Sequence, residues 1–107
     1  MRYLNMLVVG VILLLAGCAT VPSQEMADAR TELRAAEAAN AARYAPAQLA
    51  VARRRLADAE SRLELGDYAE ARRNAERARM DAIDARIQAQ QEAQRNTGQG
   101  DAGAPGR

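Results

Sequence analysis

The sequence predicts an all-α fold, an antiparallel, alanine-rich helical hairpin with an additional N-terminal helix. Alanine supplies half of the hydrophobic residues, and it is the residue with the highest intrinsic helix propensity. Small and apolar residues also recur at steps of three and four positions, which is the period of one helix face. These stripes are interrupted at Pro46 and at Gly66. We therefore expect either three helices or a kinked two-helix arrangement, packed like a coiled coil within one helical domain over residues 24–95.

The first helix is expected at about residues 24–44. One face of it carries Met26, Ala29, Leu33, Ala36 and Asn40. Ser23 stands where an N-cap side chain would accept a backbone hydrogen bond. Pro46 has no amide hydrogen and disfavours helical geometry at Ala45, so a kink or a turn is expected near them. The sequence leaves open whether this helix continues into the next one through a kink at Pro46.

Two further helices are expected at about residues 47–65 and 67–95. Gly66 is a suitable residue to end a helix, and Asp67 with Glu70 has the spacing of a capping box. Leucines of the second helix are expected to pack against an alanine face of the third, so that the two helices approach closely. This helix-packing seam consists of Leu49, Leu56, Leu63, Tyr68, Ala71, Ala75, Ala78 and Ala82.

The last segment, residues 96–107, contains four glycines and a proline. Glycine-rich segments behave as flexible chains, and chain ends are often poorly ordered. We therefore expect a disordered, glycine-rich tail after the third helix.

Residues 1–17 look like a bacterial lipoprotein signal peptide. A basic residue near the start precedes an apolar run of about ten residues, which falls well short of the ~20 that a membrane span needs. The only cysteine, Cys18, follows Gly17, and a cysteine thiolate is a nucleophile that can accept a diacylglyceryl group. We expect signal cleavage between Gly17 and Cys18, a lipid on Cys18, and a short lipidated tether over residues 18–23.

Two alternatives stand beside the lipid anchor: a plain secretory signal with an incidental cysteine, and a buried N-terminal helix. Ala19 follows the cysteine in place of aspartate, which resembles the outer-membrane sorting pattern of bacterial lipoproteins. The expected location is therefore the periplasmic face of the outer membrane, with the inner membrane as the alternative.

The composition argues against catalysis and against nucleic-acid binding. The sequence has no histidine, so it lacks the usual general base near neutral pH and the imidazole ligand of many metal sites. Cleavage before Cys18 removes one of the 15 basic residues and leaves the 14 acidic residues in balance with the remainder, whereas nucleic-acid binders carry a net basic face. We expect no catalytic site, no metal, no cofactor other than the covalent lipid, and no nucleic-acid partner.

Arginine clusters are the candidate binding residues. They are Arg53, Arg54 and Arg55 in one run, with Arg72 and Arg73 in a second group that continues to Arg77 and Arg79. The guanidinium fork suits carboxylates and phosphates, so contact with peptidoglycan or lipopolysaccharide is one interpretation. A solvated helix face balanced by nearby acidic residues is the other. The sequence contains no lysine for a crosslink to peptidoglycan, so any contact with the cell wall would be noncovalent.

Three groups of residues in the central part of the chain carry a family resemblance. They are Ala41-Ala42-Arg43-Tyr44-Ala45-Pro46, then Leu49, Ala52, Leu56 and Ala59, and then Gly66-Asp67-Tyr68 followed by Ala71, Ala75, Ala78 and Asp81-Ala82. Through these residues the chain resembles, over about residues 24–90, a family of small bacterial envelope lipoproteins, the domain-of-unknown-function 4398 family. The role of that family is undefined, so the resemblance implies an envelope location and no particular activity.

These features predict a non-enzymatic, lipid-anchored periplasmic protein that acts as a structural or interaction module of the cell envelope. The lipid would hold it at the membrane, and the alanine seam would dock a protein partner or a second copy. The alternative function is noncovalent binding of peptidoglycan or lipopolysaccharide through the arginine clusters. The sequence leaves the identity of the partner, the oligomeric state and the physiological process open.

Overall fold

The computed structural model describes residues 1–16 and 20–102, and its regular elements within these ranges are all helices. In chain order they are α1 (Arg2–Ala16), α2 (Ser23–Ala38), α3 (Ala41–Tyr44), α4 (Pro46–Glu64) and α5 (Tyr68–Ala102). The all-α class, predicted from the alanine content and the periodicity, is therefore confirmed.

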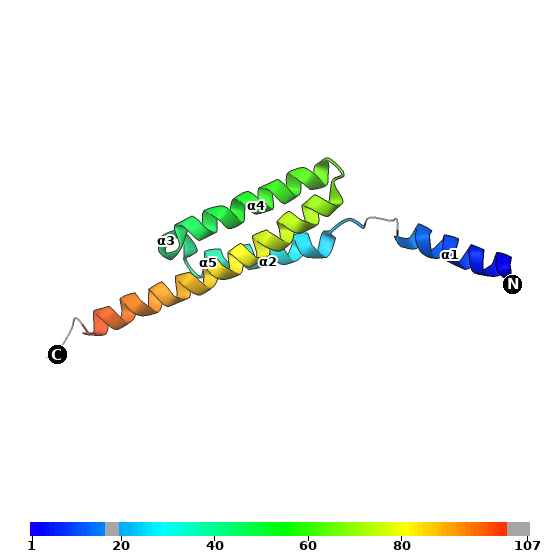
Figure 1. Cartoon of the computed structure of the whole chain (residues 1–107). Coiled ribbons are helices and arrows are strands. Elements are labelled where there is room, and N and C mark those ends of the chain that lie inside the picture. The colour runs from blue at the N-terminus through cyan, green and yellow to red at the C-terminus, as the bar shows by residue number, and fades with distance from the viewer. Residues whose placement is uncertain (17–19, 103–107) are drawn as a thin grey trace.

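Helices α2, α4 and α5 pack along one another (Figure 1). Helix α4 runs antiparallel to α5, which follows it after a short turn, and α2 runs in the same direction as α5. Helix α5 contacts both of the other long helices extensively, whereas α2 and α4 contact each other less. The hairpin of the fold is thus α4 with α5, and the additional helix is α2.

The first packed helix is shorter than expected, because the chain leaves helical geometry at Asn40 and again at Ala45, just before Pro46. Helix α2 ends at Ala38, and Asn40 adopts a left-handed backbone with φ 62°. Ala45 has φ −144°, so the single turn α3 has non-helical residues on both sides. Asparagine visits the left-handed region more readily than most residues, which explains the break. The expected helix over residues 24–44 is therefore corrected to two pieces, and α2 does not continue into α4 through a kink.

Prolines stand at the starts of two helices. Pro46 is the first residue of α4, where the missing amide hydrogen is no loss, because the first N–H groups of a helix have no intrahelical partner. At α2 the expected N-cap was Ser23, but this residue is already helical, and Pro22 takes the cap position without a side-chain hydrogen bond. Pro22 is fully buried, so packing rather than capping determines where α2 begins.

The turn between α4 and α5 has the hydrogen bonds of a Schellman motif. Gly66 has φ 77°, and its amide donates to the carbonyl of Leu63 at 3.0 Å. The Asp67 amide donates to the carbonyl of Arg62 at 2.9 Å. The Asp67 carboxylate in turn accepts from the amide of Glu70 at 3.5 Å, which caps α5. Gly66 and Asp67 thus end one helix and start the next, as their spacing predicted.

Gly66→Ala should lower the free energy of unfolding by about 1–2 kcal/mol, because a Cβ atom strains the left-handed backbone by that amount. No heavy atom lies within 4 Å of a Cβ built there, so the loss comes from the backbone rather than from a clash. Gly98→Ala is the matched control, since Gly98 is helical and a Cβ there also meets open space. Urea unfolding followed by circular dichroism measures both changes, and equal effects would contradict the strain argument.

Two buried clusters lie along the bundle. The turn-side cluster consists of Met26, Ala29, Leu56, Ala59, Ala75 and Ala78. The distal cluster consists of Ala36, Ala41, Ala45, Leu49, Ala85 and Ala89. In both clusters α5 contributes only alanine, and the larger side chains come from α2 and α4, so the backbones approach closely. Among the described residues no polar or charged side chain is buried, and the interior therefore depends on apolar packing.

Helix α5 continues to Ala102, beyond the end expected near residue 95. The hydroxyl of Thr97 donates to the carbonyl of Ala93 at 2.9 Å, and this part of α5 extends past α3 (Figure 1). Elongating an existing helix needs no new nucleus, so glycines at about 1 kcal/mol each weaken the segment without ending it. The expected disorder is therefore corrected for residues 96–102, and residues 103–107 lie outside the described part of the chain.

Candidate interaction surfaces

The predicted lipid site, Gly17 and Cys18, lies outside the described residues, so the lipid remains a prediction. The segment before it forms α1, a helix of 15 residues without an acidic side chain in its first turn. Its exposed apolar side chains include Leu4, Leu7 and Val8, which line one shallow hollow. Of the helices that are described, none is both long enough and apolar enough to cross a membrane.

The residues of the predicted alanine seam lie inside the bundle. Leu49 and Leu56 are buried, as are Ala71, Ala75, Ala78 and Ala82, while Leu63 and Tyr68 are half-buried. Met26 of α2 joins the leucines of α4 against this face, so one alanine stripe serves two neighbouring helices. The seam is thus occupied within a single chain. A partner protein or a second copy needs a different surface from the one that the sequence pattern indicated.

The first arginine cluster is divided between faces of the bundle. Nη2 of Arg53 lies 3.1 Å from a carboxylate oxygen of Glu37 on α2. Nε of Arg55 lies 2.7 Å from a carboxylate oxygen of Asp81 on α5. Neighbours along α4 therefore point to opposite sides, and each of them ties α4 to a different helix.

The second arginine cluster is divided in the same way. Nε of Arg72 lies 3.3 Å from Glu25 on α2, whereas Arg73 pairs at 2.6 Å with Glu70 on its own helix. Arg54, from the first cluster, is exposed and has no ion-pair partner among the described side chains. These five arginines consequently do not gather into one basic surface.

Two more ion pairs between helices were not singled out from the sequence. Arg30 on α2 lies 3.5 Å from Glu60 on α4, and Arg86 on α5 lies 3.6 Å from Glu32 on α2. All three helix interfaces therefore carry at least one pair. Pairs this exposed contribute about 0.2–1 kcal/mol each, so their main effect is to favour the alignment in which opposite charges meet. Sequence spacing reveals charge neighbours on one helix only, which is why these partners were missed.

A double-mutant cycle on Arg55→Gln and Asp81→Asn should give a coupling free energy of about 0.2–1 kcal/mol, because the pair is partly exposed. The same cycle with Arg54→Gln in place of Arg55→Gln should give a coupling near zero, since Arg54 lies on the outer side of α4. Urea denaturation of the four proteins in each cycle measures both couplings. A coupling of equal size in the two cycles would show that the contact across helices is not specific.

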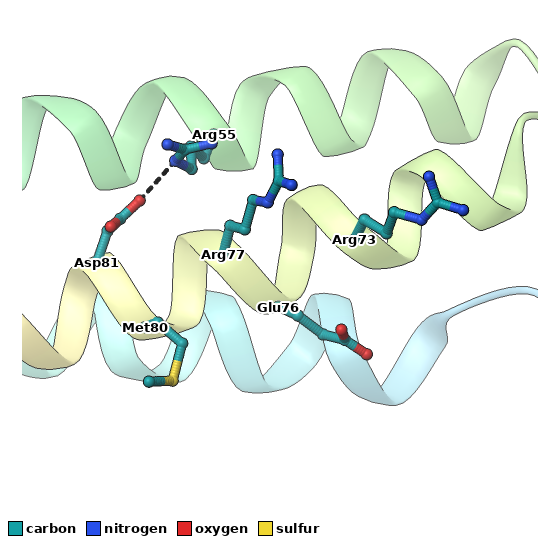
Figure 2. Close-up of a pocket in the computed structure, with 6 residues that line it drawn as sticks. All are labelled: Arg55, Arg73, Glu76, Arg77, Met80 and Asp81. Atoms are coloured by element: carbon teal, nitrogen blue, oxygen red, sulfur yellow. Dashed lines mark ion pairs between the residues drawn. The ribbon is translucent and has the colours of Figure 1, made fainter.

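An open groove of about 480 Å³ lies between α4 and α5, lined by Arg55, Arg73, Glu76, Arg77, Met80 and Asp81. Figure 2 shows Arg77 projecting from α5 toward α4, beside the pair formed by Arg55 and Asp81. Arg77 has no carboxylate within ion-pair distance among the described residues, so it is the groove guanidinium available to an anionic ligand. The groove is shallow and charged, which suits contact with an extended polar molecule.

The exposed side chains of the described residues are suited to contact with a partner molecule. None of the described residues form a group of three or more Cys, Asp or Glu that could hold a metal ion. The exposed features are ion pairs, the groove arginine and isolated apolar side chains, the last including Leu65, Met80 and Ile87. Such surfaces recognise partners through charge and apolar contact.

Comparison with known families gives a match over most of the chain. Residues 24–101 match the family model described as Domain of unknown function (DUF4398), and the match spans α3, α4 and nearly all of α2 and α5. Neither a curated relative nor a solved structure matches the chain.

Proposed function

Since the chain belongs to the DUF4398 family, whose description assigns no activity, we propose a function from its own residues. It is a non-enzymatic, lipid-anchored helical protein at the periplasmic face of the outer membrane, where it acts as a structural or interaction module of the envelope. The single observation that carries this proposal is the N-terminal pattern: a short apolar helix, then Gly17, then the only cysteine of the sequence.

The chemistry of a lipid anchor fits this position. Cleavage before Cys18 places the thiol on the first residue of the mature chain, where two or more acyl chains give stable membrane attachment. The absence of histidine from the sequence supports a role without catalysis, because histidine is the usual general base near neutral pH. The only expected prosthetic group is the covalent lipid.

The test is mass spectrometry of the mature protein after expression of the full chain in a Gram-negative bacterium, combined with separation of the inner and outer membranes. We expect a chain that starts at Cys18, carries acyl groups on that residue and fractionates with the outer membrane. Cys18→Ser is the control, and it should carry no lipid and leave the membrane fraction. A wild-type chain that starts elsewhere, or that carries no lipid, would contradict the proposal.

The groove between α4 and α5 favours a second candidate function, noncovalent contact with an anionic polymer such as peptidoglycan or lipopolysaccharide. Arg77 supplies the unpaired guanidinium, and Arg55 and Arg73 lie in the same groove. Neutral detergent keeps the lipidated chain soluble for cosedimentation with purified peptidoglycan sacculi. Arg77→Gln should reduce the retained fraction severalfold at physiological salt, whereas Arg54→Gln should leave it unchanged. Equal retention of the two variants would exclude the groove as the binding surface.

A further inference from the structure

The segment that follows the signal sequence is attached to the first turns of α5. Nη2 of Arg72 donates to the carbonyl of Thr20 at 3.3 Å and to its hydroxyl at 3.1 Å. The same guanidinium pairs with Glu25, and Pro22, between these two contacts, is fully buried. Residues 20–22 therefore form part of the bundle and not a free tether.

This attachment determines from which end of the bundle the anchored residue emerges. Arg72 lies on the first turns of α5, close to the turn that joins α4 and α5. Figure 1 shows the start of α2 beside that turn, whereas α3 and the end of α5 lie at the opposite end. Cys18 is two residues before Thr20, and two residues span at most about 7 Å. A lipid on Cys18 would therefore join the chain within about 7 Å of Thr20, at the bundle end that carries the α4–α5 turn.

Two large apolar side chains are exposed at this same end. Leu65, the last residue before Gly66 in the turn, is 74% exposed, and Val21 is 50% exposed. Leu65 is the most exposed large hydrophobic residue of the described bundle. Its position at the turn does not require an apolar residue, because the turn is made by the backbone of residues 62–67.

The charges at this end nearly cancel. Arg62 lies 3.5 Å from Asp67, and Arg72 and Arg73 each pair with a glutamate, as described above. Binding of an anionic polymer, or attraction of a basic patch to anionic lipid headgroups, would need unpaired arginines here. The paired arginines leave no basic patch at this end, so its exposed attraction for a membrane is apolar.

The geometry points to a membrane-contact surface at the α4–α5 turn, in which Leu65 and Val21 enter the interfacial region of the lipid bilayer that holds the anchor. This inference rests on the proposed lipid on Cys18, and it adds the orientation of the bundle. With the turn on the membrane, α5 is directed away from it. A helix of 35 residues is about 50 Å long, so α5 reaches into the periplasm toward other envelope components.

Tryptophan fluorescence tests this orientation, because the natural sequence contains no tryptophan. Leu65→Trp places a single probe at the turn, and Ile87→Trp places one at an exposed apolar site about 30 Å further along α5. The full lipidated chains are reconstituted into vesicles of phosphatidylethanolamine and phosphatidylglycerol that contain phosphatidylcholine brominated on its acyl chains. Unchanged helicity and urea midpoint of each variant establish that the fold is intact, and Val21→Trp provides a second probe of the same surface.

Leu65→Trp should emit at shorter wavelength in vesicles and be quenched about twofold more than Ile87→Trp, since interfacial contact buries apolar side chains about 5–10 Å into the headgroup region. The quenching should persist at high salt, because the contact is apolar. Equal quenching of the two probes, or stronger quenching of Ile87→Trp, would overturn the orientation. Loss of quenching at high salt would overturn the apolar contact.

Mass spectrometry of the same samples separates this inference from the proposed function. A chain with lipid on Cys18 whose Leu65→Trp probe is not quenched overturns the membrane-contact surface and leaves the lipid anchor intact. A chain that carries no lipid on Cys18 overturns the proposed function, and the orientation falls with it.

Discussion

Leu49→Ala is expected to lower the free energy of unfolding by about 2–5 kcal/mol, the usual range for a buried leucine replaced by alanine. Leu49 is 1% exposed, and the other buried members of its cluster are all alanines. Alanine side chains have no rotamers with which to fill a cavity, so only the half-buried Leu33 and Tyr44, which pack against the cluster, can move toward the space left by the leucine. Far-UV circular dichroism during urea denaturation measures the loss.

The control for Leu49→Ala is Leu65→Ala, the same substitution at the exposed turn. In aqueous solution without membranes it should change the free energy of unfolding by less than about 0.5 kcal/mol, as exposed substitutions usually do. A loss below about 1 kcal/mol for Leu49→Ala would mean that the distal cluster does not depend on its one fully buried leucine.

Ala78→Leu is the substitution with the second largest expected effect, a loss of about 1–3 kcal/mol from overpacking. Ala78 is 2% exposed on α5, where the turn-side cluster brings α2 and α4 against the same face. A leucine there cannot be accommodated by moving one neighbour, because helices on both sides approach the alanine. We expect a lower urea midpoint and, if the helices separate, weaker protection of amide hydrogens in α2.

Ala57→Leu is the matched control, because Ala57 is exposed near the middle of α4. Leucine and alanine have similar helix propensities, so its urea midpoint should stay close to that of the wild-type chain. If Ala57→Leu and Ala78→Leu were equally harmful, close packing on α5 would not be the cause.

The difference between the alanine face of α5 and the larger side chains of α2 and α4 also explains where the arginines lie. Alanine on α5 lets the helix axes come close, and long side chains at the edges of each interface can then reach across to the next helix. Arg55 and Arg72, two of the candidate contacts for an anionic polymer, meet carboxylates of a neighbouring helix. Arg77, which belongs to the second arginine cluster of the sequence, is the member of the groove that stays available.

Local chemistry made several elements predictable. The turn at Gly66 and Asp67 could be predicted from the sequence, because helix capping depends on only a few neighbouring residues. Here a glycine ends one helix and an aspartate caps the next. The buried face of α5 could be predicted because its alanines recur with the helical period. The break at Asn40 was missed because asparagine also fits a helix face in a linear pattern, and only the reversal of the chain between α2 and α4 selects its left-handed backbone.

The sequence by itself determined the helical class, the hairpin turn and the face of α5 that is buried, because propensity, capping and periodicity are local properties. Only the tertiary structure decided that α2 and α4 share that one face, that the arginines bridge helices, and that residues 20–22 are attached to α5. These features depend on which residues meet after the chain reverses direction. Distances across helices arise from packing, and no spacing along the chain encodes them.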